Sequence, residues 1–215
     1  MAPYMEGTKL GNYFKSVHYA DEALGQFIAD LDASGLLENT VIVIYGDHDA
    51  KLKKSEYVRY YNYVPETDSV LSQDDPNYQA VDYYSYEINR KVPFIIWTKD
   101  HQYQEEITEV MGMYDVLPTL GNMFGFSSPY ALGHDIFSVE ENVVVFPDAN
   151  WITNKMYYSQ SKEEGKLLNP DETVSVDYIN HYSQIANEAV SISDSIIVYD
   201  LIRKTNEAKE LTIQE

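Results

Sequence analysis

An aspartate and a histidine stand side by side directly after the most hydrophobic segment of the chain. The β-branched run Val41–Tyr45 predicts a buried strand, and Gly46 permits a tight turn before Asp47 and His48. Ligand sites of open α/β sheets lie beyond the carboxyl ends of strands. A carboxylate paired with an imidazole suits Mn, Mg, Fe or Zn. The spacing predicts a divalent-metal site, although a strand end capped by an aspartate beside a surface histidine accounts for the same residues.

The segments around this strand predict an α/β layer fold. Apolar residues recur at three- and four-residue steps over 12–31, which predicts an amphipathic helix with Gly35 as a stop signal. A short turn at 38–40 separates this helix from the strand. Helix, turn and buried strand form the repeating unit of parallel α/β sheets, so we expect Val41–Tyr45 to be a central parallel strand.

The second half of the chain predicts a mixture of elements. We expect a strand over 91–98 with Pro93 near its start, and a helix over 114–124 with Asp115 as its cap. Residues 143–146 and 151–158 predict antiparallel strands joined by a turn at 148–150. A single long helix is expected from Tyr178 to about Lys204.

Residues 51–90 interrupt this pattern with a tyrosine-rich insertion. Eight tyrosines fall within it: Tyr57, Tyr60, Tyr61, Tyr63, Tyr78, Tyr83, Tyr84 and Tyr86. Aromatic faces suit polyols, so the insertion could bind a glycerol or sugar chain. We favour a β-rich insertion whose tyrosines pack while their hydroxyls reach water.

Composition excludes several classes of protein. The chain has 215 residues, 15 Lys plus Arg, 35 Asp plus Glu and no cysteine, which gives a net charge of −20. Disulfides, thiolate metal sites and cysteine nucleophiles are therefore absent. The negative charge opposes nucleic-acid binding. We expect surface or packing roles for the other histidines, which are His18, His101, His134 and His181.

Four blocks, in order, resemble the sulfatase-like catalytic domain of lipoteichoic acid synthases and related phosphoglycerol transferases. The first runs through Asn12–Asp21 and Leu24–Phe27 to Asn39–His48. The later blocks are Asp115–Leu120, Leu132–Ser138 and Asp148–Tyr158. The sequence departs from the family at Asp49 and Ala50, where an aromatic residue and a glycine are usual.

The resemblance implies the alkaline-phosphatase-like α/β fold, here its C-terminal portion with a small antiparallel β hairpin and a long C-terminal helix. It implies that Asp47 and His48 bind a divalent metal, most often manganese, with magnesium or zinc as alternatives. The family's threonine nucleophile and glutamate ligand precede the matched region. The nucleophile is therefore expected upstream of Met1, and no catalytic residue is assigned within this sequence. We expect the chain to be inactive by itself and to need the N-terminal half of the domain as its partner.

The resemblance also implies a substrate, a reaction and a location. A substrate-binding histidine of the family would fall at about the position of Met1, so the matched region is expected to begin close to it. The threonine attacks the phosphorus of phosphatidylglycerol, diacylglycerol leaves, and the phosphoglycerol passes to a polyglycerol-phosphate chain. The enzyme would lie on the extracellular face of a bacterial membrane, attached only through helices upstream.

Two alternatives remain open, a true sulfatase and a non-catalytic module that binds cell-wall polymer. By the resemblance, residues 1–215 are expected to form the C-terminal part of one sulfatase-like domain. We divide it into four parts: a helix and the metal-ligand strand at 1–50, the tyrosine-rich insertion at 51–90, a strand with a helix at 91–140, and a hairpin with the terminal helix at 141–215.

Overall fold

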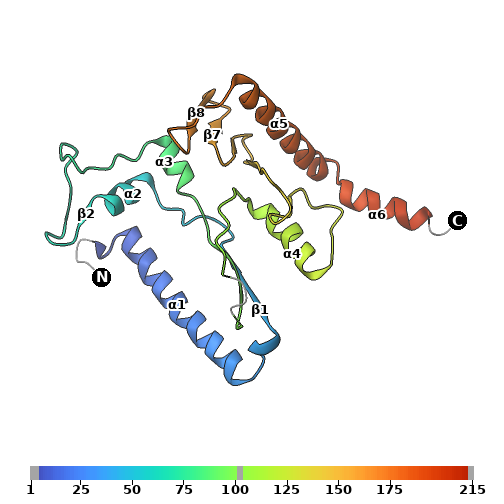
Figure 1. The fold of residues 1–215 in the computed structure, drawn as a ribbon, viewed down its shortest axis with the longest axis horizontal. Helices are drawn as coiled ribbons and strands as arrows, with labels where there is room; N and C mark the ends of the chain where they lie inside the picture. Colours follow the sequence, from blue (N-terminus) through green and yellow to red (C-terminus); the bar gives the residue numbers. More distant parts are fainter. Residues whose placement is uncertain (1–4, 101–103, 213–215) are drawn as a thin grey trace. The chain divides into compact units, whose positions relative to one another are not determined.

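The computed structural model describes residues 5–100 and 104–212, with no account of side chains from 207 onward. The chain forms two compact units, residues 1–105 and 106–215, and each is described by itself (Figure 1). Two positions singled out in the sequence lie outside the described residues. They are Met1, where the family's substrate-binding histidine and the start of the matched region were expected, and His101. The expectation of a nucleophile upstream of Met1 therefore stays a prediction.

The first unit begins with a long helix and contains a two-stranded sheet. Its elements are α1 (Lys9–Ala33), η2 (Leu37–Asn39), β1 (Val41–Tyr45), α2 (Lys54–Tyr61), β2 (Tyr63–Val64), β3 (Ser69–Val70), α3 (Tyr83–Ile88) and β4 (Phe94–Thr98). The expected first helix is confirmed and begins earlier, because the Thr8 side chain caps it by accepting a hydrogen bond from the Gly11 N–H at 2.9 Å. Gly35, at φ +71°, follows its end as expected.

The expectation of a central parallel strand at Val41–Tyr45 is wrong. In the described sheet β1 pairs only with β4, antiparallel, with Val43 opposite Ile96. Ile42 is the one buried residue of β1, and Tyr45 is exposed. An apolar run determines what both faces of a strand offer to their neighbours. It does not determine the direction of the neighbouring strand, because both kinds of ladder accept the same side chains.

A small apolar core joins α1 to the tyrosine-rich insertion. Met5, Leu10 and Leu52 are its buried members, and half-buried Phe14 and Tyr57 pack against them. The insertion itself is more helical than expected. Within the described residues 51–90, its only strands, β2 and β3, have two residues each, and the helices α2 and α3 lie on either side of them in the sequence. Tyr57, Tyr60 and Tyr61 recur at the three- and four-residue steps of a helix, and the prediction of strands overlooked that spacing.

The second unit places helix α5 over a four-stranded antiparallel sheet. Its elements are η3 (Met113–Asp115), α4 (Val116–Phe124), β5 (Val144–Val145), β6 (Trp151–Ile152), β7 (Met156–Ser159), β8 (Glu164–Leu167), α5 (Val176–Val198) and α6 (Leu201–Thr212). The sheet order is β5-β6-β7-β8. Trp151, Met156, Tyr182 and Ala186 form the core between sheet and helix.

The hairpin expected at 143–158 is confirmed in part. Its turn at 148–150 has Ala149 at φ +59°, but residues 151–158 divide into β6 and β7. β8 was not predicted because its sequence is polar. Gly165 allows β8 to approach β7, since a Cβ there would collide with the methyl group of Met156.

The single C-terminal helix is corrected to two. Helix α5 ends at Val198, and Asp200 takes a left-handed conformation at φ +50° before α6 begins. Asp adopts this conformation more readily than most residues, and no Gly or Pro marks the break in the sequence. Among the described residues, no helix has the length and hydropathy of a membrane-spanning segment.

Candidate metal centre

The expected Asp-His pair follows β1 on a turn that is closely packed. The Gly46 N–H donates to the Pro93 carbonyl at 3.1 Å, which continues the β1–β4 ladder by one bond. A Cβ on Gly46 would lie 2.7 Å from Cβ of Val92. Glycine is therefore needed here because the two backbones approach each other closely, and Asp47 and His48 emerge immediately beyond that contact.

The two side chains lie close together and open to solvent. Asp47 Oδ1 is 3.8 Å from His48 Nε2, with the side chains 87% and 54% exposed. His48 Nδ1 lies 2.5 Å from the Asp49 carbonyl oxygen. A carbonyl oxygen only accepts, so this bond requires a proton on Nδ1, and in the neutral imidazole the lone pair is then on Nε2. The free lone pair therefore belongs to the nitrogen nearer Asp47.

This arrangement fits two ligands of one divalent cation. Ligands each about 2.1 Å from an ion lie about 3–4 Å apart, which brackets the Asp47–His48 separation. Histidine ligands commonly donate their second N–H to a backbone carbonyl, as His48 does to Asp49. Within residues 5–100 and 104–212, no group of three or more His, Asp or Glu side chains is placed to hold a metal. Among these residues, the Asp47–His48 pair is therefore not joined by a third side chain of these types.

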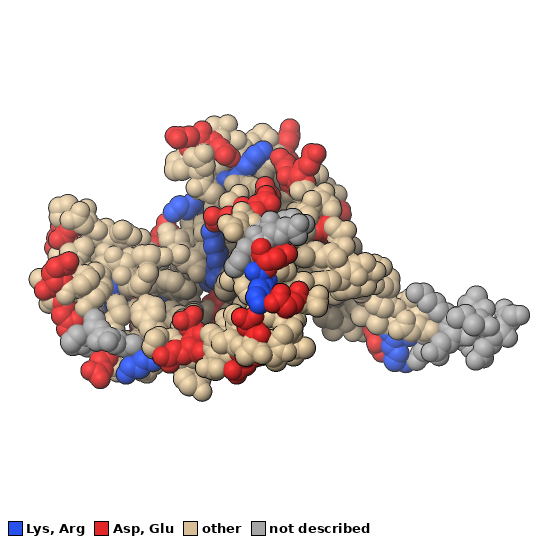
Figure 2. All heavy atoms as spheres, turned by 60° about the horizontal axis from the view of Figure 1, so that its bottom comes forward, with Lys and Arg blue, Asp and Glu red and all other residues tan. Residues whose placement is uncertain are grey.

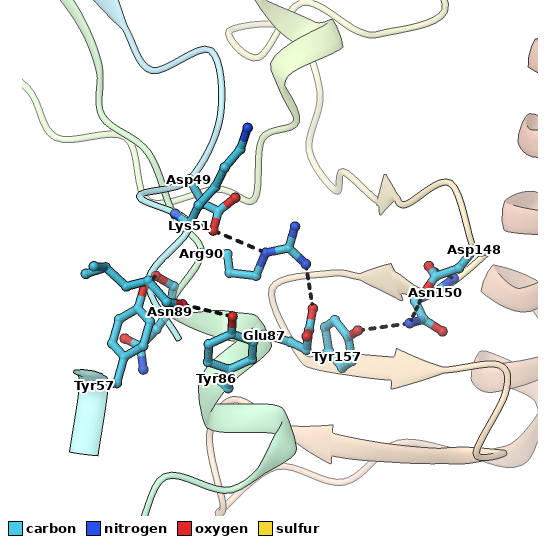
Figure 3. A network of polar contacts seen from close by, with 11 residues as sticks. Asp49, Lys51, Tyr57, Tyr86, Glu87, Asn89, Arg90, Asp148, Asn150 and Tyr157 are labelled. Atoms are coloured by element: carbon cyan, nitrogen blue, oxygen red, sulfur yellow. Dashed lines mark hydrogen bonds and ion pairs between the residues drawn. The ribbon is translucent and has the colours of Figure 1, made fainter. Parts of the chain in front are cut away.

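The residues after the pair are held by charged neighbours from other elements (Figure 3). The Asp49 carboxylate accepts from the Lys51 N–H at 3.1 Å and lies 3.7 Å from Nε of Arg90. Arg90 also contacts Glu87, with Nη1 2.9 Å from Oε2. Burial lowers the pKa of Arg90, but the hydrogen bond to Glu87 and the charges of Glu87 and Asp49 outweigh it, so the pKa is raised.

The tyrosines of the insertion use many of their hydroxyls inside the protein. Tyr61 donates to Asn89 Oδ1 at 2.8 Å, Tyr63 to Asp68 Oδ1 at 2.9 Å and Tyr86 to the Leu52 carbonyl at 2.9 Å. Tyr57 and Tyr86 pack edge to face, with ring centroids 5.6 Å apart. These contacts support the packing role that we favoured, but the expectation that the hydroxyls reach water is wrong for Tyr61, Tyr63 and Tyr86, whose hydroxyls donate to groups of the protein.

The other described histidines have local partners. His18 lies 3.6 Å from Glu22 on the same helix face. His181 packs edge-on against Tyr182, with centroids 5.0 Å apart. The His134 N–H donates to a buried carboxyl oxygen of Asp115. The contacts of His18 and His181 are those of surface and packing residues, and the contact of His134 is made by its backbone.

Sequence reasoning missed the central role of Asp115. The expectation that its side chain caps the helix, now α4, is wrong. The side chain instead accepts from the Gly112 N–H at 2.8 Å and so holds the turn η3. It also accepts from the His134 N–H at 2.8 Å and from Asn142 Nδ2 at 2.9 Å. Asp115 thereby connects two of the blocks that carry the family resemblance. The only sequence signal for this contact was that the two blocks follow each other in the order found in the family.

A similar buried group holds the 148–150 turn. Asn150 donates from Nδ2 to Asp148 and to the Tyr157 hydroxyl, at 2.7 and 3.1 Å, and accepts from the Gln160 N–H at 2.8 Å (Figure 3). The turn is therefore fixed by side chains as well as by the hairpin.

Comparison with known proteins places this chain in a family. Residues 4–126 match the family described as Sulfatase, so the chain belongs to the sulfatase family, whose domain has the alkaline-phosphatase-like fold. The helix–strand mixture of the structure is consistent with that fold.

Among curated proteins, this chain is similar to several lipoteichoic acid synthases. It is 30% identical to Lipoteichoic acid synthase 1 of Bacillus subtilis over 92% of this chain and 29% of the relative. It is 30% identical to Lipoteichoic acid synthase 2 of the same organism, over 89% of this chain and 28% of the relative. It is 29% identical to Lipoteichoic acid synthase of Staphylococcus aureus, over 89% of this chain and 28% of the relative. The chain therefore spans less than a third of the length of these relatives.

Proposed function

We propose that this chain is the C-terminal part of the catalytic domain of a metal-dependent phosphoglycerol transferase resembling lipoteichoic acid synthases. The observation that supports it most is the Asp47–His48 pair, whose histidine has its lone pair on the nitrogen 3.8 Å from the aspartate. The proposed metal is manganese, with magnesium or zinc as alternatives. A bound divalent ion would stabilise negative charge on the attacking and phosphoryl oxygens.

The roles of this chain's residues follow from that assignment. Asp47 would contribute an anionic oxygen ligand, and His48 would bind through Nε2 while Asp49 orients its ring. A catalytic metal commonly keeps at least three protein ligands, so further ligands and the nucleophile are assigned to residues outside this sequence. By this proposal the chain shows no turnover alone. The substrates would be phosphatidylglycerol and polyglycerol phosphate, at the extracellular face of a bacterial membrane.

A sulfatase is the second candidate, because the family matched by residues 4–126 carries that description. A module that binds cell-wall polymer through the insertion is less well supported. Tyr61, Tyr63 and Tyr86 each use the hydroxyl in an internal hydrogen bond.

Manganese binding tests the proposal directly. In the protein encoded by the complete reading frame, Asp47→Asn and His48→Gln should each weaken Mn²⁺ binding, measured by electron paramagnetic resonance titration, by roughly 100-fold or more. Asp21→Asn and His18→Gln change the same residue types on the exposed surface of α1 and should leave the affinity unchanged. Unaltered Mn²⁺ affinity in both pair variants would refute the metal assignment.

Activity then separates the two enzyme candidates. Release of diacylglycerol from phosphatidylglycerol vesicles, lost in Asp47→Asn, supports the transferase. Hydrolysis of an aryl sulfate in place of that reaction, lost in the same variant, would replace the transferase with a sulfatase.

A further inference from the structure

The loop that carries the Asp-His pair is attached to the end of helix α3 at two points. The Tyr86 hydroxyl donates to the Leu52 carbonyl at 2.9 Å, at the far end of the loop. Arg90 Nε lies 3.7 Å from the Asp49 carboxylate, next to His48 (Figure 3). Residues 46–52 contain no helix or strand, so contacts of this kind decide their conformation.

The attachment on the loop side is made by the residue that orients His48. The Asp49 backbone carbonyl accepts from His48 Nδ1, and its carboxylate accepts from the Lys51 N–H and faces Arg90. Lys51 is at φ +50°, a conformation that a lysine adopts only when its surroundings hold it. The orientation of the Asp49 peptide, and hence of the imidazole, depends on where its carboxylate is held. That carboxylate is only 14% exposed.

The attachment on the helix side is itself well supported. Glu87 holds the Arg90 guanidinium at 2.9 Å. Asn89 donates to the Ser85 carbonyl at 2.7 Å and accepts from the Tyr61 hydroxyl at 2.8 Å. These contacts give Arg90 a fixed base from which to hold the loop.

We propose that Arg90 is a positioning residue for the metal-binding pair: through the Asp49 carboxylate it fixes the carbonyl that orients the His48 ring. The tyrosine-rich insertion then supports the metal-binding loop, with Tyr86 as the second point of attachment. This inference rests on the proposed metal site at Asp47 and His48.

Electrostatics and positioning predict opposite effects of removing Arg90. A guanidinium near a divalent cation repels it, so by charge alone Arg90→Gln would tighten metal binding. Loss of positioning would weaken metal binding instead. The His48 ring would then be mobile without metal, and part of the binding free energy would be used to order it. Residues that orient metal ligands typically change affinity by about 10–100-fold. The sign of the change therefore separates the two effects.

The test uses Mn²⁺ titrations of the protein encoded by the complete reading frame. Arg90→Gln should weaken Mn²⁺ binding by about 10-fold or more. Lys91→Gln removes the same charge from the next, exposed residue and should leave the affinity unchanged or slightly tighter. In an Asp49→Asn background, Arg90→Gln should give no further weakening, because the carboxylate through which it acts is already gone.

A readout without metal tests the same idea independently. The ¹⁵N shifts of the His48 ring in the metal-free protein should show the proton on Nδ1. Arg90→Gln should move the proton population toward Nε2. Tyr86→Phe keeps the ring contact with Tyr57 but loses the bond to Leu52, and should cause a smaller change in the same direction. It provides the test if Arg90→Gln does not fold.

The outcomes distinguish this inference from the proposed function. If Asp47→Asn weakens Mn²⁺ binding while Arg90→Gln tightens it and leaves the His48 shifts unchanged, the positioning role is refuted and the metal site stands. If Asp47→Asn and His48→Gln have no effect on Mn²⁺, the proposed function fails. A His48 tautomer that still depends on Arg90 would then show only that Arg90 orders the loop.

Discussion

Replacing Asp115 by alanine should unfold the second unit at a markedly lower urea concentration. The side chain is 0% exposed. It accepts hydrogen bonds from the Gly112 N–H, the His134 N–H and Asn142 Nδ2, at 2.8, 2.8 and 2.9 Å. Alanine removes the acceptor and leaves these donors facing a cavity. Of the three, Asn142 keeps a second bond, to the Val110 carbonyl at 2.9 Å.

The expected loss follows from these donors. A buried donor without a partner costs about 1–3 kcal/mol. Gly112 bears the full cost, while His134, whose bond is only partly buried, and Asn142 bear smaller ones, so Asp115→Ala should lower the free energy of unfolding by about 2–5 kcal/mol. In Asp115→Asn the side-chain oxygen can face Gly112 and Asn142, while its NH₂ group opposes the His134 N–H. That variant should therefore lose about 1–3 kcal/mol.

Tryptophan fluorescence provides an assay specific to this unit. The chain has two tryptophans, so in a Trp97→Phe background Trp151 alone reports on the second unit's core. Glu109→Gln changes an exposed carboxylate a few residues before Gly112 and should keep the wild-type urea midpoint. The reasoning is refuted if Asp115→Ala unfolds with the same midpoint and slope as wild type, because the buried bonds would then contribute no net stability.

Two further predictions concern the same unit. Burial and the hydrogen bond to Glu141 raise the pKa of Tyr182 to about 12, above the unfolded value of about 10. The contribution of Tyr182 to stability should therefore be complete below about pH 10 and fall by up to about 1.4 kcal/mol per pH unit toward pH 12. Urea titrations should show this fall, and Tyr182→Phe should make it shallower, while Tyr114, whose pKa burial also raises to about 12, contributes in the same range. In Gly133→Ala the new Cβ would lie 2.6 Å from Asp115 Oδ1 and closer still to the Tyr114 carbonyl, so overpacking should cost about 1–3 kcal/mol in the same fluorescence assay, and an unchanged midpoint would contradict the packing described.

Local signals predicted most of the elements and missed specific breaks. The pattern at 12–31 predicts α1, and the apolar runs at Val41 and Phe94 predict β1 and β4. The left-handed Asp200 that divides the terminal helix carries no Gly or Pro signal. β8 is polar because one face of its sheet needs no apolar side chains. Its glycine, opposite Tyr158, is explained by the side chains of Met156 and Tyr158 on the neighbouring strand.

The adjacent Asp47 and His48 were predictable from the sequence, and the contacts that hold their loop were not. Gly46-Asp47-His48 after an apolar strand is a local pattern, and the structure keeps the two side chains 3.8 Å apart. Nothing local indicates that Arg90 faces Asp49, because 40 residues of insertion lie between them and the contact exists only once α3 is folded.

Net charge is a property that the sequence determines completely, and the acidic residues behind its value of −20 lie in scattered groups on the visible face (Figure 2). The sequence alone also determines the absence of cysteine chemistry, the amphipathic helix at the start and the adjacent Asp47 and His48. These follow from residue types and short spacings, which are unchanged by folding. Only the tertiary structure decided that β1 and β4 run antiparallel, that Asp115 is a buried acceptor and that Arg90, just after α3, faces Asp49 in the loop after β1. Each of these depends on groups distant in sequence meeting at hydrogen-bonding or ion-pairing distance, and their geometry is set by packing rather than by local preference.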